Sequence, residues 1–488
     1  MNVVVLMLLA VPLAAAVVTI WLPSHAAGAV TAAAGIASFG LVLALIPAVS
    51  HRDIDVLGFI RVDALSVVFL LATGFLYACV AVYSIGYLRS GGEAGARDRG
   101  YARLFWAGLN FFAWSMLIAP AMGNLALLWI AIEVTTIVSA LLVAIEGTDG
   151  AAEAAWKYVL LASAGLAIAL LGTIFIYYAG AHVLGQSYNL AFAPLLGVAA
   201  KLPPTVVRLA FVLAVLGFGT KVGLFPVHTW LPDAHSEAPT PVSALLSGSL
   251  LAVSFYAILR FYQVASAALG SGFPRDVLLV FGVASLLLAA LYLLDQQDYK
   301  RLLAYSSVEH MGILAIGVSF GAPIALAGVL LHVLAHAAAK GNAFMGAGVL
   351  VRKFGTKRIL SVSGGLDLLP WSGPMFLAAI LALSAMPPFG IFRSEFEIVT
   401  GGLAASHNAV AAVLVVLVTV AFFGMSVAAN RMLLTPRREP AADRGEPSVW
   451  MVVPVVAGLA ALLVLGLHPP GELVGLLDRA VNALRGTA

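Results

Sequence analysis

The first residue that could do chemistry is a lysine inside an apolar segment. Lys221 lies in the run FGTKVGLFPVHTWLPDAHSEAPTPVSALLSG, and Pro226 follows five residues later. Because proline lacks a backbone donor, we expect the helix to break there and to leave carbonyl groups in need of a partner. A buried lysine can release its proton, so this pattern is typical of a wet proton or ion pathway.

The second candidate is a polar stripe. His332, His336 and Lys340 are spaced four residues apart, which puts them on one helix face over about 12 Å. Glu309 and His310 add two titratable groups on the preceding segment. Histidine titrates near neutral pH, which favours a proton path. The alternatives are a polar seam that holds helices together and a zinc site, although an HExxH glutamate and a nearby cysteine are missing.

Carboxylates and an arginine complete a set of seven charged residues in apolar surroundings. At about 3 kcal/mol each they would cost about 20 kcal/mol unpaired, more than the roughly 5–15 kcal/mol by which proteins are stable. They must therefore face one another or water. Static ion pairs would satisfy this need, but the use of lysine rather than arginine favours a relay that releases protons. The seven are Lys221, Lys340, Arg393, Glu133, Glu309, Glu395 and Glu397.

Two other polar groups have simpler explanations. Asp63 follows Arg61 closely, which predicts an ion pair at the membrane interface. The loop after Lys221 carries two histidines and two acids whose spacing matches no standard metal-ligand pattern, so we interpret it as a polar vestibule or a turn. These four residues are His228, Asp233, His235 and Glu237.

The composition indicates an all-α polytopic membrane protein. The 488 residues are 62% hydrophobic and 10% charged, whereas charged residues make up about 25% of soluble domains. The apolar runs are continuous, unlike the alternating strands of outer-membrane barrels. Runs of about 20 residues predict about fourteen transmembrane helices. We place them at 2–21, 26–49, 62–86, 104–121, 123–145, 155–178, 205–226, 242–264, 275–295, 301–320, 322–350, 371–400, 408–432 and 449–467.

Cofactor chemistry is not expected in this chain. The one cysteine, Cys79, excludes disulfides within the chain and cysteine-ligated iron–sulfur clusters, which need about four thiolates. The sequence shows no phosphate-binding loop and no nucleotide fingerprint. We therefore expect no cofactor, no metal and no nucleic acid partner, and we assign any redox centre to partner subunits.

Charge distribution predicts the orientation. Of the 26 lysines and arginines, fifteen fall on the side that holds the loops after odd-numbered spans and eight on the other side. The positive-inside rule then places both termini outside the cell.

Internal organisation follows from two interrupted spans. One is interrupted at Pro226 and the other at Pro387–Pro388. They lie five spans apart and predict an internally repeated transporter. The predicted parts are residues 1–103 with three helices, 104–265 and 266–432 with five helices each, and 433–488 with a loop, the last span and a short tail.

Several motifs together resemble a known family. The runs WIAIE, KVGLFPVHTWLPDAHSEAPTPVSALLSG, KRLLAYSSVEHMG, HAAAKGNAFMGAG and PPFGIFRSEF are similar to the antiporter-like proton-translocating subunits. These occur in NADH:quinone oxidoreductase, in membrane-bound hydrogenases and formate hydrogenlyases, and in multisubunit (Mrp) sodium/proton antiporters. The resemblance covers about residues 60–430. It implies two inverted five-helix repeats, broken seventh and twelfth helices, and a charged axis at mid-membrane.

The resemblance also assigns individual positions. Glu133 matches the glutamate of the fifth helix, Lys221 the lysine that pairs with it, Lys340 the lysine of the eleventh helix and Glu395 the glutamate of the twelfth. Glu309, the length and the lack of a long C-terminal lateral helix resemble the hydrogenase 4 component F branch most.

One position departs from the family pattern. Where quinone-reductase members carry lysine or histidine in the eighth helix, this chain has Ala252. Ser249, Ser254 or ordered water would have to take the place of that lysine or histidine side chain.

We therefore expect a proton-translocating subunit of a membrane oxidoreductase complex of the hydrogenase type, in a prokaryotic inner membrane. It would sit in the lipid bilayer with membrane and peripheral partner subunits and would hold no catalytic residue of its own. The alternatives are a subunit of NADH:quinone oxidoreductase or of a sodium/proton antiporter, and a structural anchor for a soluble enzyme. The expected proton path is Glu133, Lys221, His228, Glu309, His310, His332, His336, Lys340 and Glu395.

Overall fold

The computed structural model describes residues 1–91, 99–436 and 444–486. Within them, twelve segments are helical, long and apolar enough to cross a membrane, and Asn2–Val18 and Ser372–Leu383 are shorter apolar helices. The predicted all-α membrane class is confirmed, whereas the count of fourteen spans is not. Three basic residues that indicated the orientation lie outside the described residues, namely Arg97, Arg437 and Arg438.

The first half of the chain contains a short antiparallel hairpin, β1 (Ile54–Val56) and β2 (Ile60–Val62), between long helices. Its helices are α1 (Asn2–Val18), α2 (Ser24–Val49), α3 (Ala64–Arg89), α4 (Arg99–Ile118), η2 (Ala119–Ala121), α5 (Leu125–Ala144), α6 (Asp149–Leu184), α7 (Phe192–Gly197), η3 (Ala199–Lys201), α8 (Pro204–Val222), α9 (Trp230–Glu237), α10 (Thr240–Leu245), the π-helical turn η4 (Leu246–Leu250) and α11 (Leu251–Leu269).

The named elements of the second half, among the residues that the structure describes, are all helices. Its helices are α12 (Gly272–Leu293), α13 (Tyr299–Phe320), α14 (Pro323–Phe354), η5 (Ile359–Ser361), α15 (Gly365–Leu368), α16 (Ser372–Leu383), α17 (Gly390–Ala404), α18 (Asn408–Leu433), α19 (Val449–Leu467) and α20 (Gly471–Arg485).

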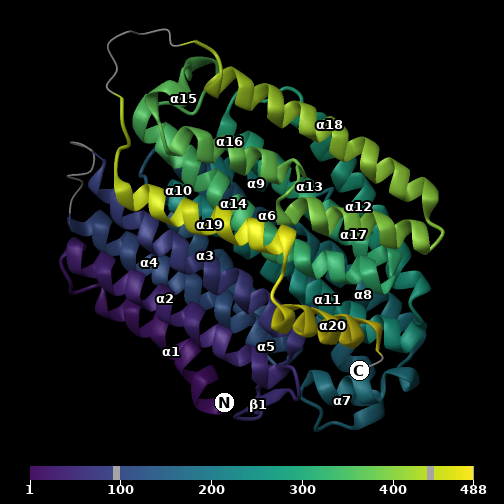
Figure 1. Ribbon diagram of the computed structural model, residues 1–488. Coiled ribbons are helices and arrows are strands. Elements are labelled where there is room, and N and C mark those ends of the chain that lie inside the picture. The colour runs from purple at the N-terminus through teal and green to yellow at the C-terminus, as the bar shows by residue number, and fades with distance from the viewer. Residues whose placement is uncertain (92–98, 437–443, 487–488) are drawn as a thin grey trace.

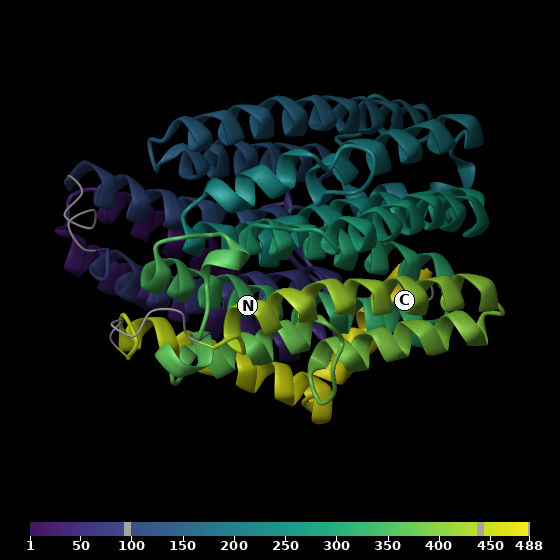
Figure 2. The same cartoon turned by 90° about the horizontal axis from the view of Figure 1, so that it is seen from above.

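The long helices lie side by side, and both termini lie at the same end of the bundle (Figure 1). The blue-teal helices α6 and α8 run along one edge and the yellow-green α18 along the opposite side (Figure 2). The share of residues buried inside the protein is highest in the apolar stretches of the segment Thr240–Leu269 (100%), of α13 (94%) and of α14 (89%). In α18 this share is 28%. Because α13 and α14 carry most of the titratable groups, those groups are enclosed by protein rather than facing lipid.

The first helix break lies where the sequence predicted an interruption, but its cause differs. The helix α8 ends at Val222. Gly223 caps it with a left-handed backbone conformation (φ 86°), and the Gly223 amide donates to the carbonyl of Gly219. Pro226 lies in the segment that follows. The carbonyl of Thr220 near the helix end accepts from the Gly223 amide at 3.3 Å and from the indole nitrogen of Trp230 at 2.8 Å. Glycine, not proline, therefore ends this helix.

The second break separates α16 from α17. The helix α16 ends at Leu383, and α17 begins at Gly390 after the Pro387–Pro388 segment. Both interruptions therefore lie where the hydropathy pattern placed them. The division of the chain into two inverted repeats stays a prediction.

The ion pairs at the hairpin end of the bundle differ from the predicted one. Asp63 caps α3 and bonds Arg260 of α11 at 2.7 Å, with side chains that are 11% and 5% exposed. Arg61 instead bonds Asp53 at 2.6 Å and Asp55 at 3.4 Å. The expectation that Asp63 pairs with Arg61 was wrong. Burial alone would raise the pKa of Asp63, but the charge and hydrogen bonds of Arg260 hold it below its usual value.

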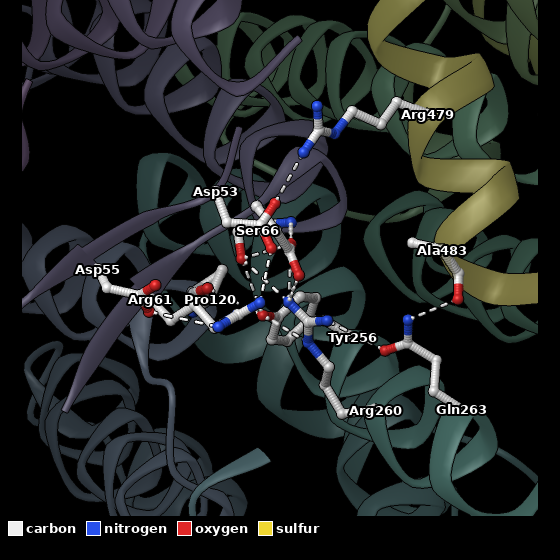
Figure 3. Close-up of polar contacts among 11 residues, drawn as sticks. Asp53, Asp55, Arg61, Ser66, Pro120, Tyr256, Arg260, Gln263, Arg479 and Ala483 are labelled. Atoms are coloured by element: carbon white, nitrogen blue, oxygen red, sulfur yellow. Dashed lines mark hydrogen bonds and ion pairs between the residues drawn. The ribbon is translucent and has the colours of Figure 1, made fainter. Parts of the chain in front are cut away.

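The C-terminal segment, which we expected only as a short tail, contains the amphipathic helix α20. The helix α20 buries Leu473, Leu476 and Leu484. Its Ala483 carbonyl accepts from Gln263 Nε2 at 3.0 Å, and Arg479 bonds Asp53 at 3.1 Å. Figure 3 shows how these contacts continue the network around Arg260. The tail thus ties α11 to the hairpin.

We predict that Asp63→Asn lowers the free energy of unfolding by about 3–5 kcal/mol, because the Arg260 guanidinium is left buried without its carboxylate. The measurement is thermal unfolding of the purified protein in detergent. Arg61→Gln is the matched control, because its partners are more exposed, and its loss should stay within about 1 kcal/mol. Equal losses for the two variants would contradict this account.

Candidate functional site

Lys221 lies in a cluster of hydroxyl groups. Its side chain is fully buried, and Nζ donates to Thr136 Oγ1 at 2.8 Å and to the hydroxyl of Tyr158. The same nitrogen lies 4.6 Å from the centre of the Tyr158 ring, and that hydroxyl bonds Ser139 Oγ at 2.7 Å. The helices α5 and α6 thus supply the polar surroundings for a cation at the end of α8.

The ion pair expected between Lys221 and Glu133 is not formed. Glu133 is half-buried on α5, one turn before Thr136, and its Oε1 accepts from Ser163 Oγ at 3.0 Å. Among the described residues no carboxylate lies within 4.0 Å of Lys221 Nζ. The two groups are neighbours that interact electrostatically without contact.

Close packing of α6 on α8 fixes the position of Lys221. A Cβ atom at Gly217, one turn before the lysine, would lie 2.4 Å from the backbone nitrogen of Ala169. At Gly219, on another face of the same helix, the nearest atom would be 3.5 Å away, on Leu224. Only a glycine at residue 217 therefore lets the two helices approach this closely.

Lys340 has similar surroundings in the second half. Its side chain is fully buried on α14, and Nζ donates to the Leu303 carbonyl at 2.9 Å and to the Ser306 hydroxyl. Both acceptors belong to α13. Glu309 follows Ser306 by one turn and is 2% exposed, and its Oε2 has no hydrogen-bond partner within the described ranges.

Three histidines and a glutamate continue this line. His310 Nδ1 lies 3.1 Å from His332 Nε2, and His332 Nδ1 lies 2.9 Å from Ser394 Oγ. The ring of His336 is 5.2 Å from that of His310, and Glu395 Oε1 is 3.9 Å from His310 Nδ1. The helices α13, α14 and α17 therefore bring together the residues that the sequence placed on three separate spans.

His310, His332 and Glu395 also have the geometry of a possible metal site. One ligand atom from each lies within 4.8 Å of the others. However, the 3.1 Å contact between His310 and His332 uses a ring nitrogen of each, and a metal ion would have to displace the proton they share. The arrangement suits proton sharing, and the expectation of no metal stays a prediction.

Three expected residues lie away from these clusters. Arg393 and Glu397 bond each other at 3.0 Å, one turn apart on α17, with side chains 36% and 20% exposed. The two charges pair with each other on α17 and make no contact with His310, His332, His336 or Glu395 among the described residues. His228 lies between α8 and α9, 5% exposed, with its ring 6.4 Å from that of Phe225. No contact in the described part of the chain joins it to Lys221 or to the histidines.

The serines proposed to replace a charge at Ala252 have other partners. Ser249 Oγ bonds Thr73 Oγ1 of α3 at 2.7 Å, and Ser254 Oγ donates to the Leu250 carbonyl of its own helix. Ala252 itself is buried.

Sequence reasoning missed His235. We interpreted it as part of a polar vestibule or a turn, whereas it lies on α9 and is completely buried, with its ring centre 5.8 Å from that of Phe344 of α14. The helix is only eight residues long, too short for a periodic pattern. The available signal was its place in the HTWLPDAH segment.

A cavity of about 1170 Å³ lies at the Arg89 end of α3, away from the hairpin. Lys300 lines it and donates to the Ser236 and Ala238 carbonyls at 2.9 and 2.6 Å. Because Lys300 precedes Leu303 by one turn on α13, the cavity reaches α13 close to the carbonyl that accepts from Lys340.

Residues 122–422 match the transmembrane family described as NADH:quinone oxidoreductase/Mrp antiporter. The chain belongs to this family. It is 35% identical over 420 residues to a hydrogenase-4 component F homologue of Methylacidiphilum infernorum (isolate V4), covering 85% of this chain and 87% of the relative. It is 33% identical over 364 residues to NADH-quinone oxidoreductase subunit N of Desulforudis audaxviator (strain MP104C), covering 71% and 70%.

Solved structures agree with this assignment. A chain of the Mrp complex from a Dietzia species superposes with a TM-score of 0.86 at 22% identity, over 99% of this chain and 97% of the other. A chain of Thermus thermophilus respiratory complex I with bound NADH gives 0.81 at 25% identity, over 99% of both chains. The Dietzia match shows a shared fold, and the predicted family is confirmed.

We predict that Gly217→Ala destabilises the protein by about 1–3 kcal/mol, because the added methyl group overpacks the contact between α6 and α8. Gly219→Ala should be neutral or should stabilise the protein by up to about 1 kcal/mol through helix propensity. Thermal unfolding in detergent measures both. If the two alanines behaved alike, close packing would not be what places Lys221.

Proposed function

We propose that this chain is the proton-translocating antiporter-like subunit of a membrane-bound oxidoreductase complex. The observation that carries the proposal is the line of buried protonatable side chains from Lys340 through His310 and His332 to Glu395. These groups contact one another or backbone and hydroxyl groups, which suits transfer of protons between neighbours.

The chemistry of the two lysines supports the same proposal. A buried ammonium group held by hydroxyl and carbonyl oxygens can lose its proton without leaving a carboxylate unpaired. Lys221 and Lys340 both have this environment, each with a glutamate nearby but not in contact. A proton arriving at or leaving Glu133 or Glu309 would change the charge that the neighbouring lysine experiences.

The predicted orientation decides which side of the membrane the cavity faces. In the inner membrane of a prokaryote, with both termini outside, the cavity at Lys300 faces the cytoplasm. Protons would enter there, reach Lys340 along α13 and leave past Glu395. Electron transfer in partner subunits would drive the charge changes, since this chain carries one cysteine and no recognised redox motif.

We favour a hydrogenase-type complex with membrane and peripheral partner subunits. The supporting observation is the 35% identity to a hydrogenase-4 component F homologue over most of both chains. A subunit of a cation/proton antiporter is the second candidate, because the Mrp chain has the same fold throughout. Purification of the chain with its partners separates the two, because only the first would bring redox proteins with it.

We predict that Lys221→Ala lowers proton uptake by proteoliposomes of the intact complex about tenfold or more, while the complex still assembles. The reason is that the hydroxyl cluster of Thr136 and Tyr158 would lose the group that carries the proton. The measurement is acidification per electron transferred, followed with a pH-sensitive dye.

Lys201→Ala is the control, because this lysine is exposed at the end of η3, away from the interior line. Unchanged uptake and unchanged electron transfer in Lys221→Ala would leave only the anchor function for this chain.

A further inference from the structure

The cavity at the Arg89 end of α3 lies where several membrane-spanning helices begin or end. Ser24 is the first residue of α2 and Arg89 the last of α3, and both line the cavity. Lys300 lies in the first turn of α13 and Arg352 in the last turn of α14. The helix α14 has 32 residues and is therefore about 48 Å long, longer than the hydrocarbon core of about 30 Å. The cavity therefore lies at the depth of the lipid headgroups.

The lining of this cavity carries an excess of positive charge. Five basic and three acidic side chains line it. The carboxylates are engaged within the protein, because Glu237 bonds Lys357 at 2.8 Å, Asp298 caps α13, and Glu146 accepts from a tyrosine hydroxyl at 3.0 Å. The excess charge favours an anionic ligand. The basic side chains are Arg89, Lys300, Arg352, Lys357 and Arg358.

Arg352 is held in a fixed position by Tyr87 of α3. Its Nη2 donates to the Tyr87 carbonyl at 3.1 Å, and its guanidinium carbon lies 4.1 Å from the centre of the Tyr87 ring. Its enclosed Nε has no hydrogen-bond partner among the described residues. An arginine held in this way is prepared to bind a phosphate group, which accepts from two N–H groups of one guanidinium at once.

The other part of the cavity wall is apolar and aromatic. Ile85, Leu88 and Val351 line it together with Tyr101 and Trp106. Aromatic side chains of this kind are enriched where a membrane protein meets the headgroup layer. The cavity volume of about 1170 Å³ exceeds the about 300–1,000 Å³ of common ligand pockets. The space therefore suits a ligand that joins an anionic group to an apolar part.

We propose that this cavity binds an anionic phospholipid, with its phosphate group on Arg352 and Arg89 and the start of its acyl chains against the apolar wall. Phosphate oxygens form charge-assisted hydrogen bonds with guanidinium groups, and basic pockets between membrane-spanning helices suit such headgroups. A headgroup with an amine fits less well, because the carboxylates of the cavity already have partners. The inference does not depend on the proposed function, since it concerns binding alone.

The test titrates phosphatidylglycerol into the delipidated full chain in detergent and counts bound lipid by native mass spectrometry. We expect one phosphatidylglycerol per chain to bind at least about tenfold more tightly than phosphatidylcholine, and inorganic phosphate not to compete. Arg89→Gln should weaken this binding about tenfold, because one charge-assisted contact is lost. Arg431→Gln is the matched control, because Arg431 is exposed in the last turn of α18 and does not line the cavity. It should leave the affinity unchanged.

Arg352→Gln should also weaken binding about tenfold. Because this arginine joins α14 to α3, its variant is first checked by thermal unfolding. If it does not fold, the double variant Arg89→Gln/Arg358→Gln replaces it with the same expectation, since both side chains are exposed.

Three results would overturn the proposal. Equal affinity for phosphatidylglycerol and phosphatidylcholine, or equal effects of Arg89→Gln and Arg431→Gln, would mean that lipid only surrounds the bundle. Competition by inorganic phosphate would mean a site for a soluble anion. No bound lipid at all would leave the cavity to another occupant, such as an acidic segment of a partner subunit. None of these results would change the proton uptake expected of Lys221→Ala, so the proposed function stands or fails separately.

Discussion

The structure depends on one constraint, which is that every polar group enclosed by a membrane-spanning bundle must find its partner within the protein. The chain meets it for both lysines with hydroxyl or carbonyl oxygens of neighbouring helices, α5 and α6 for Lys221 and α13 for Lys340. Such short side chains reach a lysine only if the helices approach closely. The glycine contact at Gly217 is a consequence of this requirement, as is the burial of the helices that carry the other titratable groups.

The two ends of the bundle are built differently. At the hairpin end, Arg260 pairs with Asp63 and the tail helix closes over the neighbouring network. At the opposite end a cavity admits solvent as far as Lys300. The ion pair and the cavity therefore make the two ends of the bundle unequal in their access to solvent.

The sequence predicted the helical class, the family and both interruptions, because hydropathy and motifs are local signals. It failed where partners are distant. Asp63 pairs with Arg260, 197 residues away, and its neighbour Arg61 offered a simpler but wrong explanation. Arg393 and Glu397 looked like interior charges, yet their four-residue spacing lets them satisfy each other on a half-exposed face. His235 could not be recognised because the short helix that buries it between two halves is defined only by tertiary packing.

The hydroxyl surroundings of Lys221 have a further consequence. A hydroxyl group rotates about its C–O bond and can present either its hydrogen or its lone pairs. Tyr158, Ser139 and Thr136 can therefore accept from an ammonium group or donate to a neutral amine with their heavy atoms in place. Carboxylates in the same positions would hold one charge state far more strongly. The hydroxyl groups around this lysine can therefore form hydrogen bonds with either form without repacking of the helices.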